Sequence, residues 1–244
     1  HLDAVTGRIS STRRNLQNIP PVIRPMFIPD NRVFTSWDGS QIELRCLAHL
    51  SGDEGMLRIF SLPKYLGDGT KNIEADIHQA TADFMGIDRK VAKNVNFSMV
   101  YGGSVETIAE TAHILNVGRA RRLKELWFRK FPQAGEWITQ TQEEGLRDGY
   151  VTTLYGRKIE LPMYEEDEAG IRRKACNYPI QGSAAESIKR AMLECAHLPL
   201  TLQVHDELVF EIKTDLVQKL APKFKQIMES VHQLDVPLVV DVKY

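Results

Sequence analysis

The spacing of apolar residues divides the chain into segments with different predicted structures. Apolar positions run close together from Val33 to Trp37, which predicts a strand, and then recur at helical intervals over residues 41–60. Helical spacing resumes at Asn72 and continues to Gly156. Breaks are expected at the glycines and the proline of this stretch, namely Gly86, Gly102, Gly103, Gly118, Pro132 and Gly149. Residues 1–30, which are rich in proline, are expected to be extended.

Strand-like patterns return in the second half of the chain. Residues 151–154 and 159–161 flank the sequence Tyr-Gly-Arg-Lys and predict a hairpin. A helix is expected from about Asp167 towards Ala196, with an interruption at Pro179.

The C-terminal part of the chain predicts two strands, a helix and a final strand. Residues 200–212 would form the two strands, with His205 and Asp206 at the turn. An apolar face over residues 216–231 predicts a helix that Pro222 could kink, and residues 236–242 predict the last strand. Strands therefore cluster at both ends of the chain and helices fill its middle. The expected fold is α+β, with an antiparallel sheet made from both ends and a helical insertion.

Composition adds limits on domain number, nucleic-acid binding, disulfide formation and membrane insertion. With 244 residues, of which 43% are hydrophobic, the chain can bury a core as one or two domains. The formal net charge of −1 does not indicate a polyanionic partner, so nucleic-acid binding must be argued from local placement. Three cysteines at positions 46, 176 and 195 match no zinc-binding spacing and predict reduced, intracellular thiols. No apolar run reaches the ~18 residues that span a membrane, so no membrane partner is expected.

Two carboxylate sites far apart in sequence give the first indication of chemistry. Asp38 ends the first predicted strand, and Asp206 with Glu207 lies at the turn of the C-terminal strand pair. An isolated carboxylate among such apolar residues would be costly, so each acid is expected to need a partner. Two acids brought together from different strands most often share a divalent cation, and hard oxygen ligands favour magnesium.

A second indication lies in a predicted helix that Asp88 would cap. One face of this helix carries four side chains at intervals of four: Arg89, Lys93, Phe97 and Tyr101. Each step of four residues rotates by about 40° beyond a full turn, so these side chains lie along one slowly winding stripe. The opposite side carries apolar residues that can pack: Val91, Val95, Met99 and Val100.

The order of residues along this stripe matches the layout of a nucleoside triphosphate. Arg89 and Lys93 lie near the helix N-terminus, where the helix dipole and free N–H groups already favour phosphate. Phe97 and Tyr101 can offer their faces to a sugar or a base. A simpler interpretation is an amphipathic helix with a solvated basic start and two core aromatics. The helix alone favours the simpler interpretation, and the carboxylate pair reverses that preference.

Together these residues resemble the polymerase domain of family A DNA polymerases, the bacterial polymerase I type. Residues 38–45 (Asp-Gly-Ser-Gln-Ile-Glu-Leu-Arg) look like the first palm motif, residues 89–102 like the fingers helix, and residues 204–207 (Val-His-Asp-Glu) like the second palm motif. Residues 6–8, 15–20 and 177–182 also match, in family order. Three long motifs in order are far more specific than one short pattern. The resemblance covers almost the whole chain and implies a DNA-templated DNA polymerase of replication or repair.

The resemblance implies a role for each acid and for the stripe. Asp38 and Asp206, with the backbone carbonyl of Gly39, would hold two Mg²⁺ ions, for which Mn²⁺ could substitute. Glu207 would be a supporting catalytic acid, although a solvated strand residue is the alternative. The residues that would bind the dNTP are Gln41, Ile42, Glu43, His78, Arg89, Lys93, Phe97 and Tyr101.

Three of these nucleotide-binding residues have more specific implied roles or alternatives. Glu43 would be the steric gate that rejects a ribose 2′-hydroxyl, and its alternative is an ordinary glutamate on a helix surface. Tyr101 would stack at the template position until the fingers close. His78 would lie near the triphosphate, but it could equally be a satisfied structural histidine.

The same resemblance implies contacts with primer–template DNA. The candidate residues are Arg8, Asn15, Gln17, Asn18, Arg173, Asn177, Gln181 and His205. Four of them, Arg8, Asn177, Gln181 and His205, would read minor-groove acceptors that every correct base pair presents. The basic residues between Arg119 and Lys130 could approach single-stranded template, but a solvated helix face is the preferred interpretation.

The sequence also departs from the family pattern. Gly39 stands where the family usually has tyrosine, and the segment Pro20–Met26 is shorter than expected. His1 begins after the place where family members carry a thumb and usually a proofreading domain. We therefore expect a palm-and-fingers portion without a thumb, which needs an N-terminal thumb-bearing segment or chain for full activity. The expected division is palm over 1–66, fingers over 67–183 and palm again over 184–244, in a bacterial or viral-host cytoplasm or in an organelle.

Two other functions remain open at this point. A non-catalytic nucleic-acid-binding remnant of a polymerase would keep the fold, but the intact residues Asp38, Asp206, Arg89 and Lys93 argue against it. A two-metal nuclease could use the same acids, but it has no need of a stripe that runs from cations to aromatics.

Overall fold

The computed structural model describes residues 4–11, 15–20, 22–23, 26–29 and 32–243. Parts of the extended segment 1–30 and of the segment Pro20–Met26 lie outside the described residues. The chain divides into two units. The first contains residues 1–42, 181–233 and 238–244, and the second contains residues 43–180 and 234–237.

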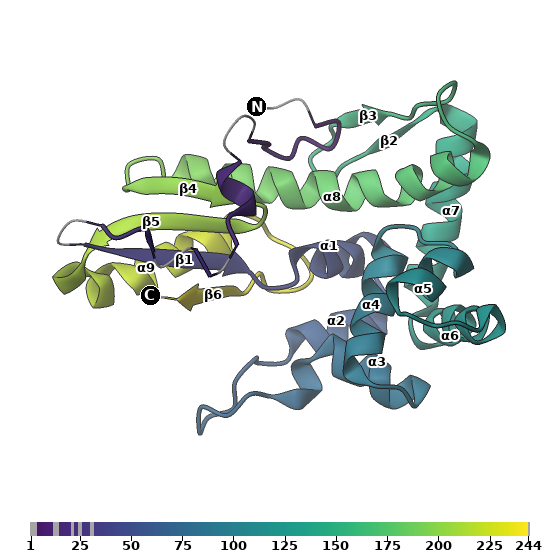
Figure 1. The fold of residues 1–244 in the computed structure, drawn as a ribbon, viewed down its shortest axis with the longest axis horizontal. Helices are drawn as coiled ribbons and strands as arrows, with labels where there is room; N and C mark the ends of the chain where they lie inside the picture. The colour runs from purple at the N-terminus through teal and green to yellow at the C-terminus, as the bar shows by residue number, and fades with distance from the viewer. Residues whose placement is uncertain (1–3, 12–14, 21, 24–25, 30–31, 244) are drawn as a thin grey trace. The chain divides into compact units, whose positions relative to one another are not determined.

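An antiparallel sheet with the strand order β4-β5-β1-β6 forms the centre of the first unit (Figure 1). β1 (Arg32–Gly39) comes from the N-terminal part of the chain. β4 (Leu200–Val204), β5 (Glu207–Lys213) and β6 (Val240–Lys243) come from the C-terminal part. The strand patterns at both ends of the sequence therefore meet in one sheet, which confirms the predicted antiparallel α+β fold.

Alternating side chains give this sheet a buried face and a half-buried face. On β1, Thr35 and Trp37 are buried, whereas Ser36 and Asp38 are half-buried. On the buried face, the ring centroid of Trp37 lies 6.3 Å from that of Phe210 in β5 and 5.6 Å from that of Phe224 in helix α9 (Val217–Ser230). The half-buried face is the one that carries the carboxylates.

Among the described residues, the other elements of the first unit are two short 3-10 helices and part of a helix whose remaining residues belong to the second unit. The 3-10 helices are η1 (Leu16–Asn18) and η4 (Thr214–Leu216), and residues 181–194 of helix α8 (Glu168–Glu194) also belong here. Pro222 lies inside α9 without ending it. β6 begins later than the predicted strand over residues 236–242, and the buried Val236 and Leu238 precede it.

The second unit is mainly helical, as predicted. Its helices are α1 (Ile42–Ser51, of which residue 42 belongs to the first unit), α2 (Glu54–Ser61), η3 (Ile73–Ala75), α3 (Ile77–Met85), α4 (Arg89–Val100), α5 (Val105–Thr111), α6 (Val117–Lys130), α7 (Pro132–Asp148) and residues 168–180 of α8. The predicted hairpin is confirmed as β2 (Tyr150–Thr152) and β3 (Lys158–Glu160). The break predicted at Gly118 lies just before it, between Thr111 and Val117, and because Asn116 caps α6 the glycine itself is in the first turn of the helix. No helix in the described ranges is both long and apolar enough to cross a membrane.

Helix α8 (Glu168–Glu194) differs from its prediction because it continues through Pro179. Proline removes one backbone N–H and crowds the preceding turn, which normally kinks or ends a helix. Here Cys176, Ile180 and Ala184 are buried on both sides of the proline. We attribute the continuity to this packing, which outweighs the local cost.

Asp53 joins the N-termini of two helices in the second unit. Its side chain is fully buried, and one carboxylate oxygen accepts the N–H of Met56 in α2 at 2.9 Å. The other oxygen accepts the N–H groups of Gln133 and Ala134 in α7 at 3.1 and 3.2 Å. One carboxylate thus satisfies free N–H groups of two helices that are distant in sequence.

Helices α1 and α2 belong to the second, mainly helical unit. The division expected from the sequence instead assigned them to the palm, because it placed residues 1–66 there. Units of this kind need not coincide with functional subdomains. The palm and fingers boundaries at 66/67 and 183/184 therefore stay predictions.

Candidate active site

Three acidic residues lie side by side at one end of the sheet in the first unit. Asp38 of β1 pairs with Glu207 of β5 on one side and with Asp241 of β6 on the other. Residues directly opposite each other in antiparallel strands project from the same face, so the three carboxylates share one face. Sequence reasoning missed Asp241, although its place between two valines of a predicted strand could have indicated it.

Asp206 reaches the same end of the sheet through the turn between β4 and β5. His205 closes this turn with a φ of 53°, which is uncommon for a residue with a side chain. The backbone N–H of Gly39 donates to the carbonyl of Asp206 at 3.1 Å. The fold therefore brings together Asp38, Gly39 and Asp206, the residues that sequence reasoning grouped as one site.

The surroundings of Asp38 are unfavourable for negative charge. Burial raises the pKa of Asp38, and the charge of Asp206 raises it further, as do Glu207 and Asp241, while Lys243 opposes them. A bound cation would relieve this cost.

The oxygen atoms of Asp38, Asp206 and the Gly39 carbonyl are ligands of the kind that magnesium prefers, so the site fits the predicted metal. Within the described part of the chain, no group of three or more His, Cys, Asp or Glu side chains is arranged to hold a metal ion. The fit therefore rests on two carboxylates and a backbone oxygen. Glu207 is half-buried beside them and accepts a hydrogen bond from the Ser36 hydroxyl.

The predicted stripe lies on α4 in the second unit. Asp88 caps the helix by accepting the N–H of Lys90 at 2.7 Å, as expected. Arg89 and Lys93 are exposed, Phe97 is half-buried, and Tyr101 is 39% exposed, while Val95, Met99 and Val100 are buried on the other side. These burial states confirm the predicted two-sided helix.

Ring contacts connect the residues of the stripe. The rings of Phe97 and Tyr101 are stacked, with centroids 6.4 Å apart and planes 23° from parallel. The Nζ of Lys93 lies 5.8 Å from the centre of the Phe97 ring. The order from cations to aromatics is thus kept along one continuous face of the helix.

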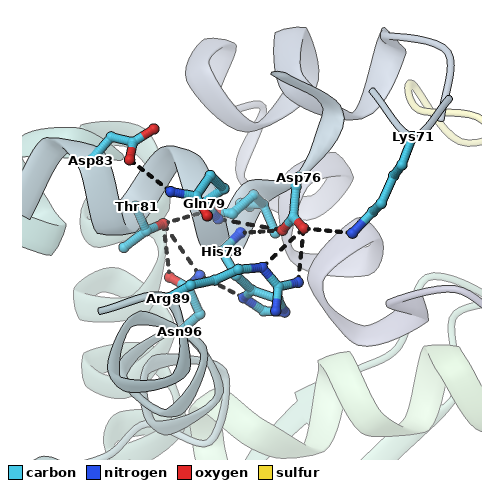
Figure 2. A network of polar contacts seen from close by, with 9 residues as sticks. Lys71, Asp76, His78, Gln79, Thr81, Asp83, Arg89 and Asn96 are labelled. Carbon is cyan, nitrogen blue, oxygen red and sulfur yellow. Dashed lines mark hydrogen bonds and ion pairs between the residues drawn. The ribbon is translucent and has the colours of Figure 1, made fainter. Parts of the chain in front are cut away.

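A buried carboxylate holds Arg89 in place (Figure 2). Asp76 caps α3 with one oxygen, which accepts the N–H groups of His78 and Gln79 at 3.1 and 3.3 Å. Its other oxygen accepts hydrogen bonds from Nε and Nη2 of Arg89 at 3.0 and 2.7 Å and from Nζ of Lys71 at 2.9 Å. Burial opposes ionisation of Asp76, yet the hydrogen bonds from Lys71 and Arg89 outweigh it and lower its pKa to about 2. Sequence reasoning selected neither Asp76 nor Lys71.

His78 is buried beside this network, and its ring is fixed in one tautomer. The Nε1–H of Trp127 can only donate, and it donates to Oδ1 of Asn96 at 2.8 Å. The amide nitrogen of Asn96 therefore faces Nδ1 of His78, at 2.9 Å. Because that nitrogen donates, Nδ1 accepts, and the ring proton lies on Nε2.

The charge state of His78 follows from its burial. Burial lowers the pKa of His78 to about 4, with Asp76 opposing and nearby cations adding to the effect. The ring is therefore neutral at pH 7. The neutral imidazole keeps one N–H donor, on Nε2.

Glu43 and Tyr101 form a hydrogen-bonded pair in the second unit. Glu43 lies in the first turn of α1 and is only 7% exposed, which excludes the interpretation as a surface glutamate. The hydroxyl of Tyr101 donates to its carboxylate at 2.9 Å. Near this pair in sequence, Gln41 has a φ of 55° and a buried side-chain oxygen without a hydrogen-bond partner, and Ile42 is buried.

The predicted DNA-contacting residues differ widely in exposure. Gln17 is buried, and its amide donates to the carbonyl of Ile9 at 3.1 Å and to Oε1 of Gln203 at 3.0 Å. This amide therefore fastens the N-terminal segment to β4. The side chain of Asn15 caps η1, and Asn18 is exposed.

The remaining candidates for DNA contact lie on α8, at the β4–β5 turn and near the N-terminus. Arg173 and His205 are exposed, and Arg8 and Gln181 are half-buried. The Nδ2 atom of Asn177 is buried without a hydrogen-bond partner. Such an orphan donor is costly unless a ligand satisfies it.

Comparison with known proteins shows similarity to one family. The sequence model of DNA polymerase family A matches residues 1–244. The thermostable DNA polymerase I of Thermus filiformis is 40% identical over 265 residues, covering 97% of this chain and 30% of that protein. DNA polymerase I of Pseudomonas aeruginosa is 34% identical over 266 residues, covering 98% of this chain and 28% of that protein.

A solved structure is similar over almost the whole chain. The POL domain of Pol1 from M. smegmatis, in complex with DNA primer-template and dNTP, matches with a TM-score of 0.84 and 31% identity. The match covers 99% of this chain and 46% of that chain. The chain thus spans less than a third of the length of the curated relatives described above.

Proposed function

Because this chain belongs to DNA polymerase family A, we propose that it catalyses DNA-templated transfer of a nucleotide from a dNTP to a primer 3′-hydroxyl. The observation that carries the proposal is the meeting of Asp38, Gly39 and Asp206 at one end of the sheet, where burial and the neighbouring negative charges raise the pKa of Asp38. The relatives are much longer than this chain. We therefore propose the nucleotide-transfer step for the reaction centre in this chain, and not the whole activity of those longer proteins.

Asp38 and Asp206, with the Gly39 carbonyl, would hold two Mg²⁺ ions, and Glu207 would support them. Bound there, the ions would supply positive charge that favours loss of the proton from the primer hydroxyl and stabilises the leaving pyrophosphate. In the reaction the primer oxygen bonds to the α-phosphorus, and the bond between that phosphorus and the bridging oxygen breaks.

The α4 stripe would bind the incoming nucleotide. Arg89 and Lys93 would neutralise the triphosphate, and His78 would donate its Nε2–H to a phosphate oxygen. Phe97 would pack on the sugar and base. Glu43 would exclude a ribose 2′-hydroxyl, and its hydrogen bond to Tyr101 would hold both side chains until the template base enters.

Primer–template DNA is the proposed macromolecular partner. The similar M. smegmatis structure contains DNA primer-template and dNTP, which supports this assignment by likeness. Arg8, Asn177, Gln181 and His205 remain candidates for DNA contact, and the orphan donor of Asn177 is suited to a groove acceptor. We propose that processive synthesis also needs an N-terminal thumb-bearing segment or chain.

Single-nucleotide incorporation tests the proposal. The chain is held in excess over a labelled primer–template with Mg²⁺, so that weak grip on DNA does not limit the reaction. We expect extension only with the dNTP complementary to the template, and a loss of about 10³-fold or more in Asp206→Ala. Asp215→Ala removes an exposed acid from the same unit and should leave the rate unchanged. Shortening of the primer would indicate a nuclease, and DNA binding without extension would indicate a non-catalytic remnant; either result refutes the proposal.

A further inference from the structure

Lys71 lies in the segment before α3, outside every motif assigned above. Its Nζ is 2.9 Å from the Asp76 oxygen that also binds Nη2 of Arg89 at 2.7 Å (Figure 2). The side chain of Asp76 is 5% exposed, whereas those of Lys71 and Arg89 are 54% and 43% exposed. A buried carboxylate therefore holds two cations that still reach solvent.

Positive charge is in excess around this carboxylate. Burial is the main cause that lowers the pKa of His78; Asp76 raises this pKa, and Arg89, Lys93 and Lys71 lower it further. Two cations contact this one carboxylate, so positive charge is in excess at the contact. An excess of this kind attracts a ligand with several negative charges.

The bonds to Asp76 use only part of the donor capacity of the two cations. A lysine ammonium has three N–H groups, and one of them donates to Asp76. A guanidinium has five, and the bonds to Asp76 use Nε and one N–H of Nη2 in Arg89. Donors remain on both side chains, and Asp76 has already ordered them, which lowers the entropy cost of binding a ligand.

Other hydrogen bonds hold the segment that carries Lys71 in place. The side-chain amide of Asn72 donates to the carbonyl of Pro63 at 2.9 Å, and its backbone N–H donates to the carbonyl of Lys64 at 2.8 Å. The lysine ammonium is therefore not needed to close this loop. Its place beside Arg89 calls for another explanation.

We propose that Lys71 is a further phosphate-binding cation, which acts with Arg89 and Lys93 and contacts the terminal phosphate of the incoming nucleotide. The proposal rests on the proposed polymerase function and names an additional residue for its substrate site. The stripe runs from Arg89 to the aromatic residues, and Lys71 joins it at the Arg89 end. The phosphate farthest from the base is the one that this end would meet. Asp76 would act as a positioning residue for both cations.

Calorimetric titration of the whole chain with dATP, dADP and dAMP, each with Mg²⁺, tests the role of Lys71. We expect Lys71→Met to weaken dATP binding about 5- to 10-fold and to leave dAMP binding unchanged. Lys71→Arg should restore most of the affinity. Lys64→Met is the matched control, because it removes the same charge from the same loop, where Nζ lies 5.9 Å from the centre of the Tyr65 ring. Lys71→Met should lower the melting temperature only slightly, because Asp76 loses one of its two cation partners and keeps Arg89.

Three results would overturn the inference, and they separate it from the proposed function. If Lys71→Met binds dATP normally while Arg89→Met does not, Lys71 is an ordinary loop lysine and the polymerase function stands. If Lys71→Met weakens dATP and dAMP equally, its role is structural. If the unmodified chain binds no dATP, or Arg89→Met leaves binding unchanged, the nucleotide site itself is wrong and the inference fails with it.

Discussion

Replacing Asp76 by asparagine would remove a buried charge from the second unit while keeping a side chain of the same shape. Asparagine caps helices as well as aspartate does, so the bonds to the N–H groups of His78 and Gln79 should survive. The amide nitrogen would instead replace the oxygen that accepts hydrogen bonds from Arg89 and Lys71. The substitution therefore isolates the two ion pairs from the cap.

The expected loss follows from the pKa of Asp76. Hydrogen bonds from Lys71 and Arg89, acting against burial, lower this pKa from 3.8 to about 2. Since one pKa unit corresponds to about 1.4 kcal/mol, the pairs contribute about 2 kcal/mol to the free energy of unfolding at pH 7. The folded-state pKa is depressed, so this contribution is complete above the unfolded-state pKa, near 4, and disappears as the pH falls towards 2.

Urea denaturation followed by tryptophan fluorescence, at several pH values between 7 and 3, measures this effect. Asp76→Asn should be about 2 kcal/mol less stable at pH 7, and the difference should shrink as the pH approaches 3. Asp83→Asn changes an exposed acid on the same helix and should cost less than about 0.5 kcal/mol. A difference that is equally large at pH 7 and pH 3, or one below about 0.5 kcal/mol at pH 7, would refute the reasoning.

Four further substitutions test the fold and the metal site. Asp53→Ala should lower the free energy of unfolding by about 3 kcal/mol, because one cap and two further helix N–H bonds are lost, and a loss below 1 kcal/mol in urea denaturation would contradict this. Gly39→Ala should raise stability by about 0.5 kcal/mol, since its Cβ would lie 3.6 Å or more from its neighbours, whereas Gly86→Ala, at a φ of 64°, should lower it by about 1 kcal/mol. Without divalent ions, Asp38→Asn should raise the melting temperature at neutral pH, because a raised pKa means that ionisation costs stability above that pKa and that the cost disappears at lower pH. The same variant should lose the stabilisation that Mg²⁺ gives the unmodified chain, and equal stabilisation of both would count against the metal site.

The parts of the fold that could be predicted are those that local patterns determine. Short strand-like runs of apolar residues located β1 and the β4–β5 pair, and spacing by four located the exposed face of α4. Each pattern reports whether a segment has one buried side or two. The position of Asp38 at a strand end and of Asp206 at a turn could therefore be found before their meeting was known.

The parts that could not be predicted depend on partners distant in sequence. Asp53 and Asp76 look like ordinary polar residues before helices, and only the fold shows that one caps two helices and the other holds two cations. Gln17 lies in a motif typical of DNA contact, yet its amide is used to fasten the N-terminal segment. At Pro179 the local rule predicted an interruption, and packing of the neighbouring turns overrides it.

The rate of single-nucleotide incorporation in a double-mutant cycle tests most directly whether Asp38 and Asp206 form one reaction centre. Asp38→Ala, Asp206→Ala and the double variant are compared with the unmodified chain, with enzyme in excess and Mg²⁺ saturating. Residues that act as a unit are strongly non-additive. We predict that each single variant loses about 10³-fold or more and that the double variant loses no more than the worse single one. Losses that multiply, or a single variant that keeps more than a tenth of the rate, would contradict a shared centre.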